Sequence, residues 1–161
     1  MLLMADSNNS SIKLFNTQGE HIDSLCCSHY PFRLAVLDSG SYSRPLVAVT
    51  LPHCPAIDIL KVDDNKVKKE RTIETSRRYF AVAALDATTL AVGYHRRPGI
   101  DLINLSGEVL REIRSRERVF YMEATEDGDL LCCAAGNKIL RVRVDPVDVV
   151  LYKLGLLLSL L

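Results

Sequence analysis

The sequence has no excess of charge of either sign, because 20 Lys and Arg residues balance 20 Asp and Glu residues. Total charge therefore predicts neither a nucleic-acid nor a membrane partner, and an electrostatic function would require the two signs to be separated over the surface. Helical periodicity of any length is also missing, which argues against a helical bundle or a coiled coil. With 161 residues and 48% hydrophobic content, the chain suffices for one globular domain with a buried core.

Cysteine is not placed to bind zinc. Cys26–Cys27 and Cys132–Cys133 are adjacent pairs and Cys54 stands alone, so the chain has no Cys-x-x-Cys spacing. Neighbouring residues of a strand point to opposite faces, and an odd total of five argues against a disulfide framework. We interpret all five as reduced, mostly buried small hydrophobic residues. This favours a cytoplasmic location and predicts no metal and no cofactor.

Neither end of the sequence resembles a targeting or membrane segment. The first ten residues, MLLMADSNNS, lack the charged region and the long apolar region of a signal peptide. Residues 147–161 are strongly apolar, but Lys153 interrupts them and they are shorter than the roughly 20 residues of a membrane span. We predict no membrane span and interpret this C-terminal tail as a last strand or a truncated end, with a membrane-surface anchor as the alternative.

What the sequence does contain is a repeat. Four similar segments begin at Leu2, Leu46, Leu90 and Leu130, which are 44, 44 and 40 residues apart. Each segment is an apolar run, a polar turn and an alternating stretch, which predicts a strand with one face buried. The alternation is visible in the triplets Ile12-Lys13-Leu14, Ile57-Asp58-Ile59, Ile100-Asp101-Leu102 and Leu140-Arg141-Val142.

Two further strands are expected in each unit. One is polar, as in residues 66–73 and 108–115, and the other is apolar, as in residues 31–38, 79–86 and 119–126. Four short strands in a unit of this length are typical of β-propeller blades. We predict an all-β propeller of about four four-stranded blades within residues 1–146. The blade units lie near residues 1–27, 31–74, 79–115 and 119–154, and the first lacks its innermost strand. An ordinary β-sandwich with coincidental spacing is the alternative.

The first unit resembles a known motif. In LMADSNNSSIKLFN, a strand ending in Asp6 leads through a turn with Asn9 into an alternating strand that ends at Phe15. With Leu3 and Ile12, these residues match the NHL repeat, and the segment as a whole resembles the C-terminal propeller of tripartite-motif (TRIM-NHL-like) proteins. The resemblance weakens in later units, where Thr50, Tyr94 and Ala134 stand at the position of Asp6, and the absence of tryptophan removes the Trp-Asp signature of WD repeats.

The resemblance carries expectations about completeness and function. NHL propellers usually have about six blades, so this chain is expected to be a fragment of a larger propeller or a partial ring completed by another copy through its open edges. Tripartite-motif relatives use the propeller for substrate recognition, and some bind RNA there. Any ubiquitin-ligase activity would need a RING domain, and the chain has no such cysteine pattern.

In a propeller, the turns between the second and third strands and the crossovers between blades emerge on one face. Here those loops collect basic residues, whereas acidic residues such as Asp86 and Asp127 fall on the other face. We predict one continuous binding surface, the basic face, for phosphate or carboxylate groups. Its candidate residues are Arg77, Arg78, His95, Arg96, Arg97, Arg116 and Arg118, with His29, His53 and Lys138 nearby.

These features favour a non-catalytic recognition module whose partner is a protein or single-stranded RNA. Tyr30, Tyr79 and Tyr94 are candidates for stacking on bases, although Tyr79 and Tyr94 would also suit the core. A propeller hydrolase or lyase is the enzymatic alternative, but the basic face would repel a metal ion, and motifs for catalysis are missing. A purely structural scaffold is the third interpretation.

Overall fold

The computed structural model describes residues 1–37, 45–63, 65–145 and 148–153. Over these residues the chain forms four antiparallel sheets and one short 3-10 turn, Ser7–Asn9. The first sheet has three strands and the other three have four each, always paired in chain order. The first sheet comprises β1 (Leu2–Asp6), β2 (Ser11–Phe15) and β3 (His21–Cys26). The second sheet comprises β4 (Leu34–Leu37), β5 (Leu46–Thr50), β6 (Ala56–Asp63) and β7 (Lys66–Glu74).

The third and fourth sheets repeat this pattern. The third comprises β8 (Tyr79–Ala84), β9 (Thr89–Tyr94), β10 (Ile100–Asn104) and β11 (Val109–Ile113). The fourth comprises β12 (Val119–Ala124), β13 (Leu130–Ala134), β14 (Lys138–Arg143) and β15 (Asp148–Lys153). The apolar C-terminal tail expected from residue 147 thus begins with a strand, and its residues 154–161 lie outside the described part.

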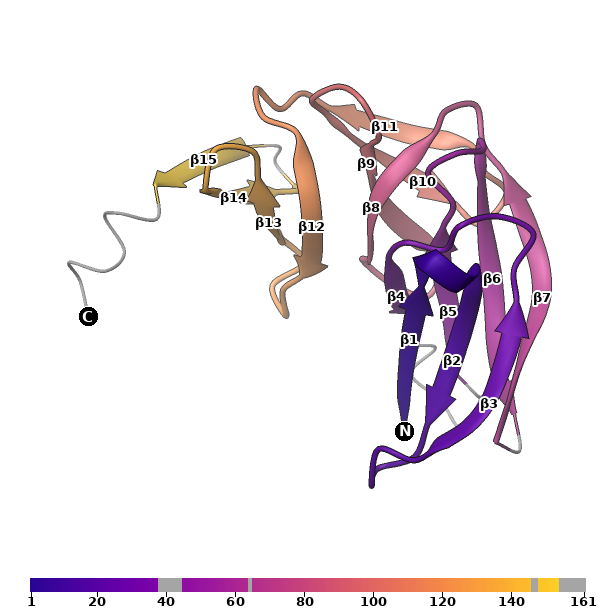
Figure 1. The fold of residues 1–161 in the computed structure, drawn as a ribbon. Coiled ribbons are helices and arrows are strands. Elements are labelled where there is room, and N and C mark those ends of the chain that lie inside the picture. Colours follow the sequence, from indigo (N-terminus) through magenta and orange to yellow (C-terminus); the bar gives the residue numbers. More distant parts are fainter. Residues whose placement is uncertain (38–44, 64, 146–147, 154–161) are drawn as a thin grey trace.

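The sheets follow one another along an arc, with the first and fourth at its two ends (Figure 1). The leading strands β4, β8 and β12 lie side by side, since β8 contacts both of the others. At the outer edge, β7 of the second sheet packs on β2 and β3 of the first. Each sheet is therefore stacked face to face on its neighbour.

A short sequence signal closes the outer hairpin of two sheets in the same way. The Asn16 side-chain oxygen accepts hydrogen bonds from the backbone N–H groups of Gln18 and Glu20. Asn104 does the same for Ser106 and Glu108. Both turns place a glycine with positive φ before the glutamate, which is the conformation that glycine adopts without strain. The repeated Asn-x-x-Gly-Glu sequence thus encodes a repeated turn.

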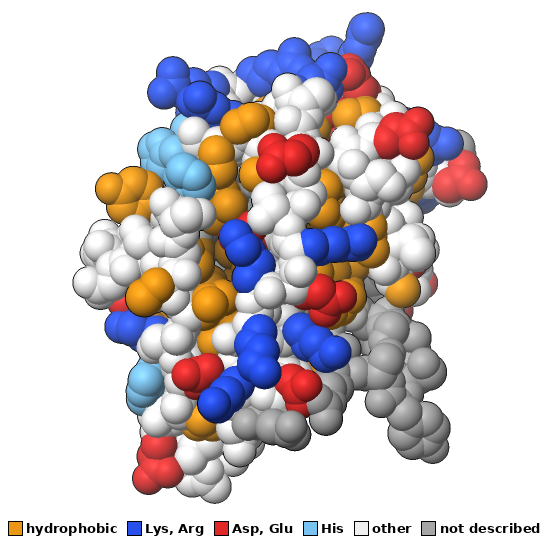
Figure 2. Space-filling model, turned by 90° about the vertical axis from the view of Figure 1, so that its right-hand side faces the viewer, with side chains coloured by type: hydrophobic (Ala, Val, Ile, Leu, Met, Phe, Trp, Pro, Cys, Tyr) orange, Lys and Arg blue, Asp and Glu red, His pale blue; other side chains and the backbone are white. Residues whose placement is uncertain are grey.

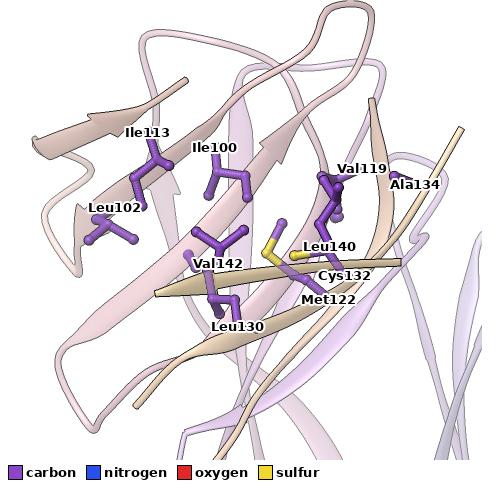
Figure 3. Close-up of a cluster of buried hydrophobic side chains, with 13 residues drawn as sticks. Ile100, Leu102, Ile113, Val119, Met122, Leu130, Cys132, Ala134, Leu140 and Val142 are labelled. Atoms are coloured by element: carbon purple, nitrogen blue, oxygen red, sulfur yellow. The ribbon is translucent and has the colours of Figure 1, made fainter. Parts of the chain in front are cut away.

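The core consists of three apolar layers, one between each pair of neighbouring sheets. The layer between the third and fourth sheets contains Ile100 and Leu102 of β10. Opposite them lie Met122, Cys132 and other side chains of the fourth sheet (Figure 3). The layer between the second and third sheets is centred on Leu90, Val92 and Ile103, and that between the first and second on Ile12, Val49 and Leu60. This burial of apolar side chains on both faces of the middle sheets supplies most of the stabilising free energy.

In β6 and β10, the third strands of the two middle sheets, the alternation of apolar and polar residues does not mark one buried and one exposed face. We predicted a strand with one face buried, but Asp58 and Asp101 are 3% and 0% exposed. The prediction is wrong here because the second and third sheets have neighbours on both faces. The polar residue of the alternation therefore faces the preceding sheet and not solvent.

The cysteines are all free, as expected, but they are not mostly buried. Only Cys132 is buried, where the loss of hydration raises the pKa of its thiol to about 12. Cys26 and Cys133 are exposed, because each lies on the open face of an end sheet. No helix in the described residues is long and apolar enough to cross a membrane.

Candidate binding face

The loops assigned to the basic face emerge together at one end of the strands. The turns after β1, β5, β9 and β13 and the crossovers before β4, β8 and β12 emerge there. Lys and Arg side chains gather along this upper edge, with histidine and hydrophobic side chains just below on one side (Figure 2). Among the acids of the opposite face, Asp38 and Asp64 lie outside the described residues.

A hollow of about 340 Å³ brings together most of the predicted residues of the third sheet. It is lined by Arg77, Arg78, Tyr94, His95, Arg96 and Arg97. The side chains of Arg78 and Arg96 are exposed and form no ion pair or hydrogen bond with any described residue. Arg97 is exposed too, and its guanidinium lies 4.1 Å from the centre of the Tyr94 ring. Three cations are thus available to a ligand.

Arg77 differs from these three arginines, because its guanidinium group is bound to acidic side chains of the third sheet. Its guanidinium donates to the carboxylate of Asp101 at 2.9 Å and to that of Glu112 at 2.6 Å. These two acids raise the pKa of Arg77 further above its already high value. The side chain is 33% exposed and its donors are largely used, so its place in the predicted binding set does not fit its contacts.

Two of the three tyrosines proposed for stacking are also buried. Tyr79 is 2% exposed and donates its hydroxyl hydrogen to Asp101 at 2.6 Å, and Tyr94 is 6% exposed and donates to the same carboxylate at 2.5 Å. Burial, followed by the hydrogen bond to Asp101, raises the pKa of Tyr94 to about 12. An enclosed ring cannot stack on a base, so the stacking role is wrong for Tyr79 and Tyr94. Tyr30, by contrast, is 52% exposed.

His95 joins the third sheet to the fourth at the centre of the face. Its backbone N–H donates to Arg78, and its carbonyl accepts from the guanidinium of Arg118 at 3.0 Å. The ring stacks on Phe80 at 5.8 Å and meets the ring of His53 edge-on at 5.9 Å. Burial, and then the positive charge of Arg96, lowers the pKa of His95. Both effects favour the neutral form of the imidazole.

Arg116 and Arg118 lie on the crossover to the fourth sheet, where the basic face also contains acidic and apolar side chains. Arg116 is exposed but lines a second hollow, of about 320 Å³, with Arg114, Glu117 and apolar residues of β14 and β15. Glu117 forms an ion pair with Lys138, so this acid does not neutralise the arginines. The exposed arginines thus line two separate hollows.

Three phenylalanines at the centre of this face were not expected from the sequence. Phe32, Phe80 and Phe120 each occupy the second residue of the apolar segments in their units. Their rings converge: Phe32 lies 4.0 Å from Phe80, which lies 6.1 Å from Phe120. Arg33 lies over Phe32 and donates to the carbonyl of Phe120, tying the second sheet to the fourth. The recurrence of phenylalanine in three units was the available signal.

Chemically, this face is suited to hold anionic groups. Planar guanidinium groups donate in pairs to carboxylates and phosphates, and the half-buried rings offer apolar surface beside them. Among the described residues, no group of three or more His, Cys, Asp or Glu side chains is placed to hold a metal ion.

Comparison with known proteins gives the fold. No family model and no curated protein sequence matches the chain. The WD40 beta propeller domain of Doa1 superimposes with a TM-score of 0.71 at 16% identity, over 94% of this chain and 50% of that one. The chain has a β-propeller fold. A protein of unknown function from Bacteroides caccae gives 0.72 at 14% identity, over 95% of this chain and 57% of the other. Sqt1 of Saccharomyces cerevisiae gives 0.68 at 12% identity, over 94% and 44%.

The propeller prediction is therefore confirmed, whereas assignment to NHL repeats or to the tripartite-motif family stays a prediction. The chain spans about half the length of these solved structures. The residues behind the resemblance do act together, since Asp6 accepts hydrogen bonds from the backbone and side chain of Asn9 and from Lys13. Leu3 and Ile12 pack in the layer beneath them.

Proposed function

We propose that this propeller is a non-catalytic recognition module that binds an acidic protein segment on its basic face. The observation that carries the proposal is the hollow of the third sheet, where Arg78, Arg96 and Arg97 are exposed. Fully exposed cations on a folded surface contribute little to stability. Their concentration around one concave site is best explained by a ligand of opposite charge.

An acidic protein segment is favoured over single-stranded RNA by the state of the aromatic rings. Binding of single strands relies on exposed rings on which successive bases stack. Of the tyrosines considered for that role, only Tyr30 is exposed, and the rings of Tyr79 and Tyr94 are enclosed. A carboxylate-rich peptide needs no stacking platform and makes paired hydrogen bonds with guanidinium groups.

The test measures binding of fluorescent deca-glutamate and of a twelve-nucleotide oligouridine to the full chain by fluorescence anisotropy. Reversing two charges in Arg96→Glu/Arg97→Glu should weaken deca-glutamate binding by about tenfold or more, because each reversal replaces attraction by repulsion. The matched control is Lys66→Glu/Lys68→Glu, which reverses two exposed charges on β7, away from the basic face. This control should bind like the wild type.

Two results would overturn the proposal. Equal loss of deca-glutamate binding in both double variants would show that only net charge matters. Tight binding of the oligouridine, weakened steeply by salt and lost only in Arg96→Glu/Arg97→Glu, together with no binding of deca-glutamate, would identify RNA as the partner.

A further inference from the structure

The two end sheets of the stack each leave one face open. The second and third sheets pack on neighbours through both faces, whereas the first is covered only by the second and the fourth only by the third, among the residues described. Exposed apolar residues concentrate at these ends, with Leu2 and Met4 at 60% and 42% and Leu131 at 48%. Large exposed apolar surfaces on opposite ends of a molecule mark interaction sites.

On the open face of the first sheet, apolar residues occupy register positions that are buried in the second and third sheets. Strand pairing places Leu2 opposite Phe15 and Met4 opposite Lys13. The same register positions in the second sheet hold Val47 opposite Leu60 and Val49 opposite Asp58, and all four of these are buried against the first sheet. In the third sheet they hold Leu90 with Ile103 and Val92 with Asp101, again buried. The first sheet thus presents apolar residues where its successors bury theirs against a preceding sheet.

The open face of the fourth sheet is the counterpart. Leu131 lies opposite Arg141, and Cys133 lies opposite Ile139. Tyr121 and Tyr152 extend this apolar row, because they pair with Cys133 and Ile139, and both are exposed at 43% and 42%. In the second and third sheets the corresponding face covers the next sheet in the stack.

One cation on each of these two faces is already paired within its own sheet. Lys13 bonds to Asp6 at 2.6 Å, and Arg141 bonds to Asp129 at 2.8 Å. Covering a paired charge costs far less free energy than covering an isolated one. The fourth-sheet face also carries Glu123, which accepts a hydrogen bond from Tyr121, and Arg143, and neither forms an ion pair with a described residue. Both are exposed, so docking on this face has to accommodate these two charges.

We propose that the chain associates head to tail, with the open face of the first sheet of one copy stacked on the open face of the fourth sheet of a second copy. The contact continues the stacking that each sheet already makes with the next. A second copy fits because it carries both faces. The solved structures that match are about twice the matched length. This surface is separate from the basic face.

The test uses two charge substitutions, one at each end. Met4→Asp places a carboxylate on the open face of the first sheet, and Leu131→Asp does so on that of the fourth. Each new carboxylate lies opposite a cation of its own sheet, Lys13 or Arg141, so the monomer should keep its fold. Leu110→Asp is the matched control, since Leu110 is 54% exposed but lies on the outer strand β11 of an internal sheet.

Sedimentation velocity over a wide concentration range provides the readout. The wild type and Leu110→Asp should associate beyond the monomer, and each end variant alone should stay monomeric. A mixture of Met4→Asp with Leu131→Asp should form a one-to-one complex, because the intact fourth sheet of the first variant can meet the intact first sheet of the second. Circular dichroism checks that each variant is folded.

Three outcomes would overturn the proposal. A wild type that stays monomeric at every concentration would exclude a second copy as the occupant. Association that survives in Met4→Asp or Leu131→Asp alone would place the contact elsewhere. A mixture that fails to form the one-to-one complex, with both variants folded, would exclude head-to-tail geometry. Maleimide labelling gives a second readout, because Cys133 lies on the fourth-sheet face and should be protected only in the complex.

Discussion

Removing the Asp101 carboxylate should destabilise the protein more than any other single change in the third sheet. Asp101 is 0% exposed and accepts hydrogen bonds from Arg77 at 2.9 Å, Tyr79 at 2.6 Å and Tyr94 at 2.5 Å. In Asp101→Ala both hydroxyl groups lose their acceptor inside the protein. Breaking a buried charge pair of this kind costs about 3–5 kcal/mol of unfolding free energy.

The neighbouring sheet offers a matched control at the same register position. Asp58 is 3% exposed, but it accepts from Thr72 at 2.6 Å and lies 3.6 Å from the ammonium group of Lys69, which is 44% exposed. Thr72 is exposed as well, so both partners can bond to water once the carboxylate is removed. Asp58→Ala should therefore cost only about 1–2 kcal/mol.

Urea unfolding followed by far-ultraviolet circular dichroism measures both costs, provided that the slopes with urea stay equal among the variants. Tyr79→Phe, which deletes one hydroxyl but keeps the ring, should lie between the wild type and Asp101→Ala. If Asp101→Ala cost no more than Asp58→Ala, the carboxylate would not be the centre of a buried network, and Arg77 would return to the candidates for ligand binding.

Two further predictions concern the turns. Gly107→Ala should cost well above the roughly 1–2 kcal/mol of a positive-φ alanine, because a Cβ there would lie 2.1 Å from the carbonyl oxygen of Glu74. Gly128→Ala, at a similar φ of +79° with open space around it, is the control, and equal losses in thermal unfolding would refute the clash. The hydrogen bond from Lys13 lowers the pKa of Asp6 from 3.8 to about 2, so Asp6 stabilises the fold above pH 3.8 and loses this effect as the pH falls to 2. Asp6→Asn should flatten the pH dependence of the melting temperature in that window, and an unchanged profile would contradict the assignment.

The architecture could be predicted from the sequence because the repeat consists of strand and turn patterns, which depend on residues close together in the chain. Alternating strands and polar turns recur at a nearly constant spacing, and the turns after Asn16 and Asn104 use the same side-chain hydrogen bonds. The sequence also predicted which loops share one face, because that follows from strand direction alone. What it could not give was the partner of each side chain, since contacts between sheets join residues far apart in the chain.

The register of the repeat shows this limit. Aligning the units by their leading leucines equates Leu46 with Leu90, but strand pairing equates Val47 with Leu90. Val47 lies opposite Leu60 and Leu90 lies opposite Ile103, and each of these partners is the second residue after the buried aspartate of its strand. A shift of one residue reverses the face on which a side chain lies. Apolar residues stand at both positions, so sequence patterning could not distinguish the two alignments.

The same limit explains why adjacent arginines on the basic face differ in role. Arg77 precedes β8, and its guanidinium group forms an ion pair with the buried carboxylate of Asp101. Arg96 and Arg97 lie on the tight turn between β9 and β10, which holds them beyond the reach of that acid, and the ring of Tyr94 fills the space beneath Arg97. Sequence composition counts the three cations alike. The hydrogen-bonded contact with one buried carboxylate distinguishes Arg77, which stabilises the fold, from the exposed Arg96 and Arg97.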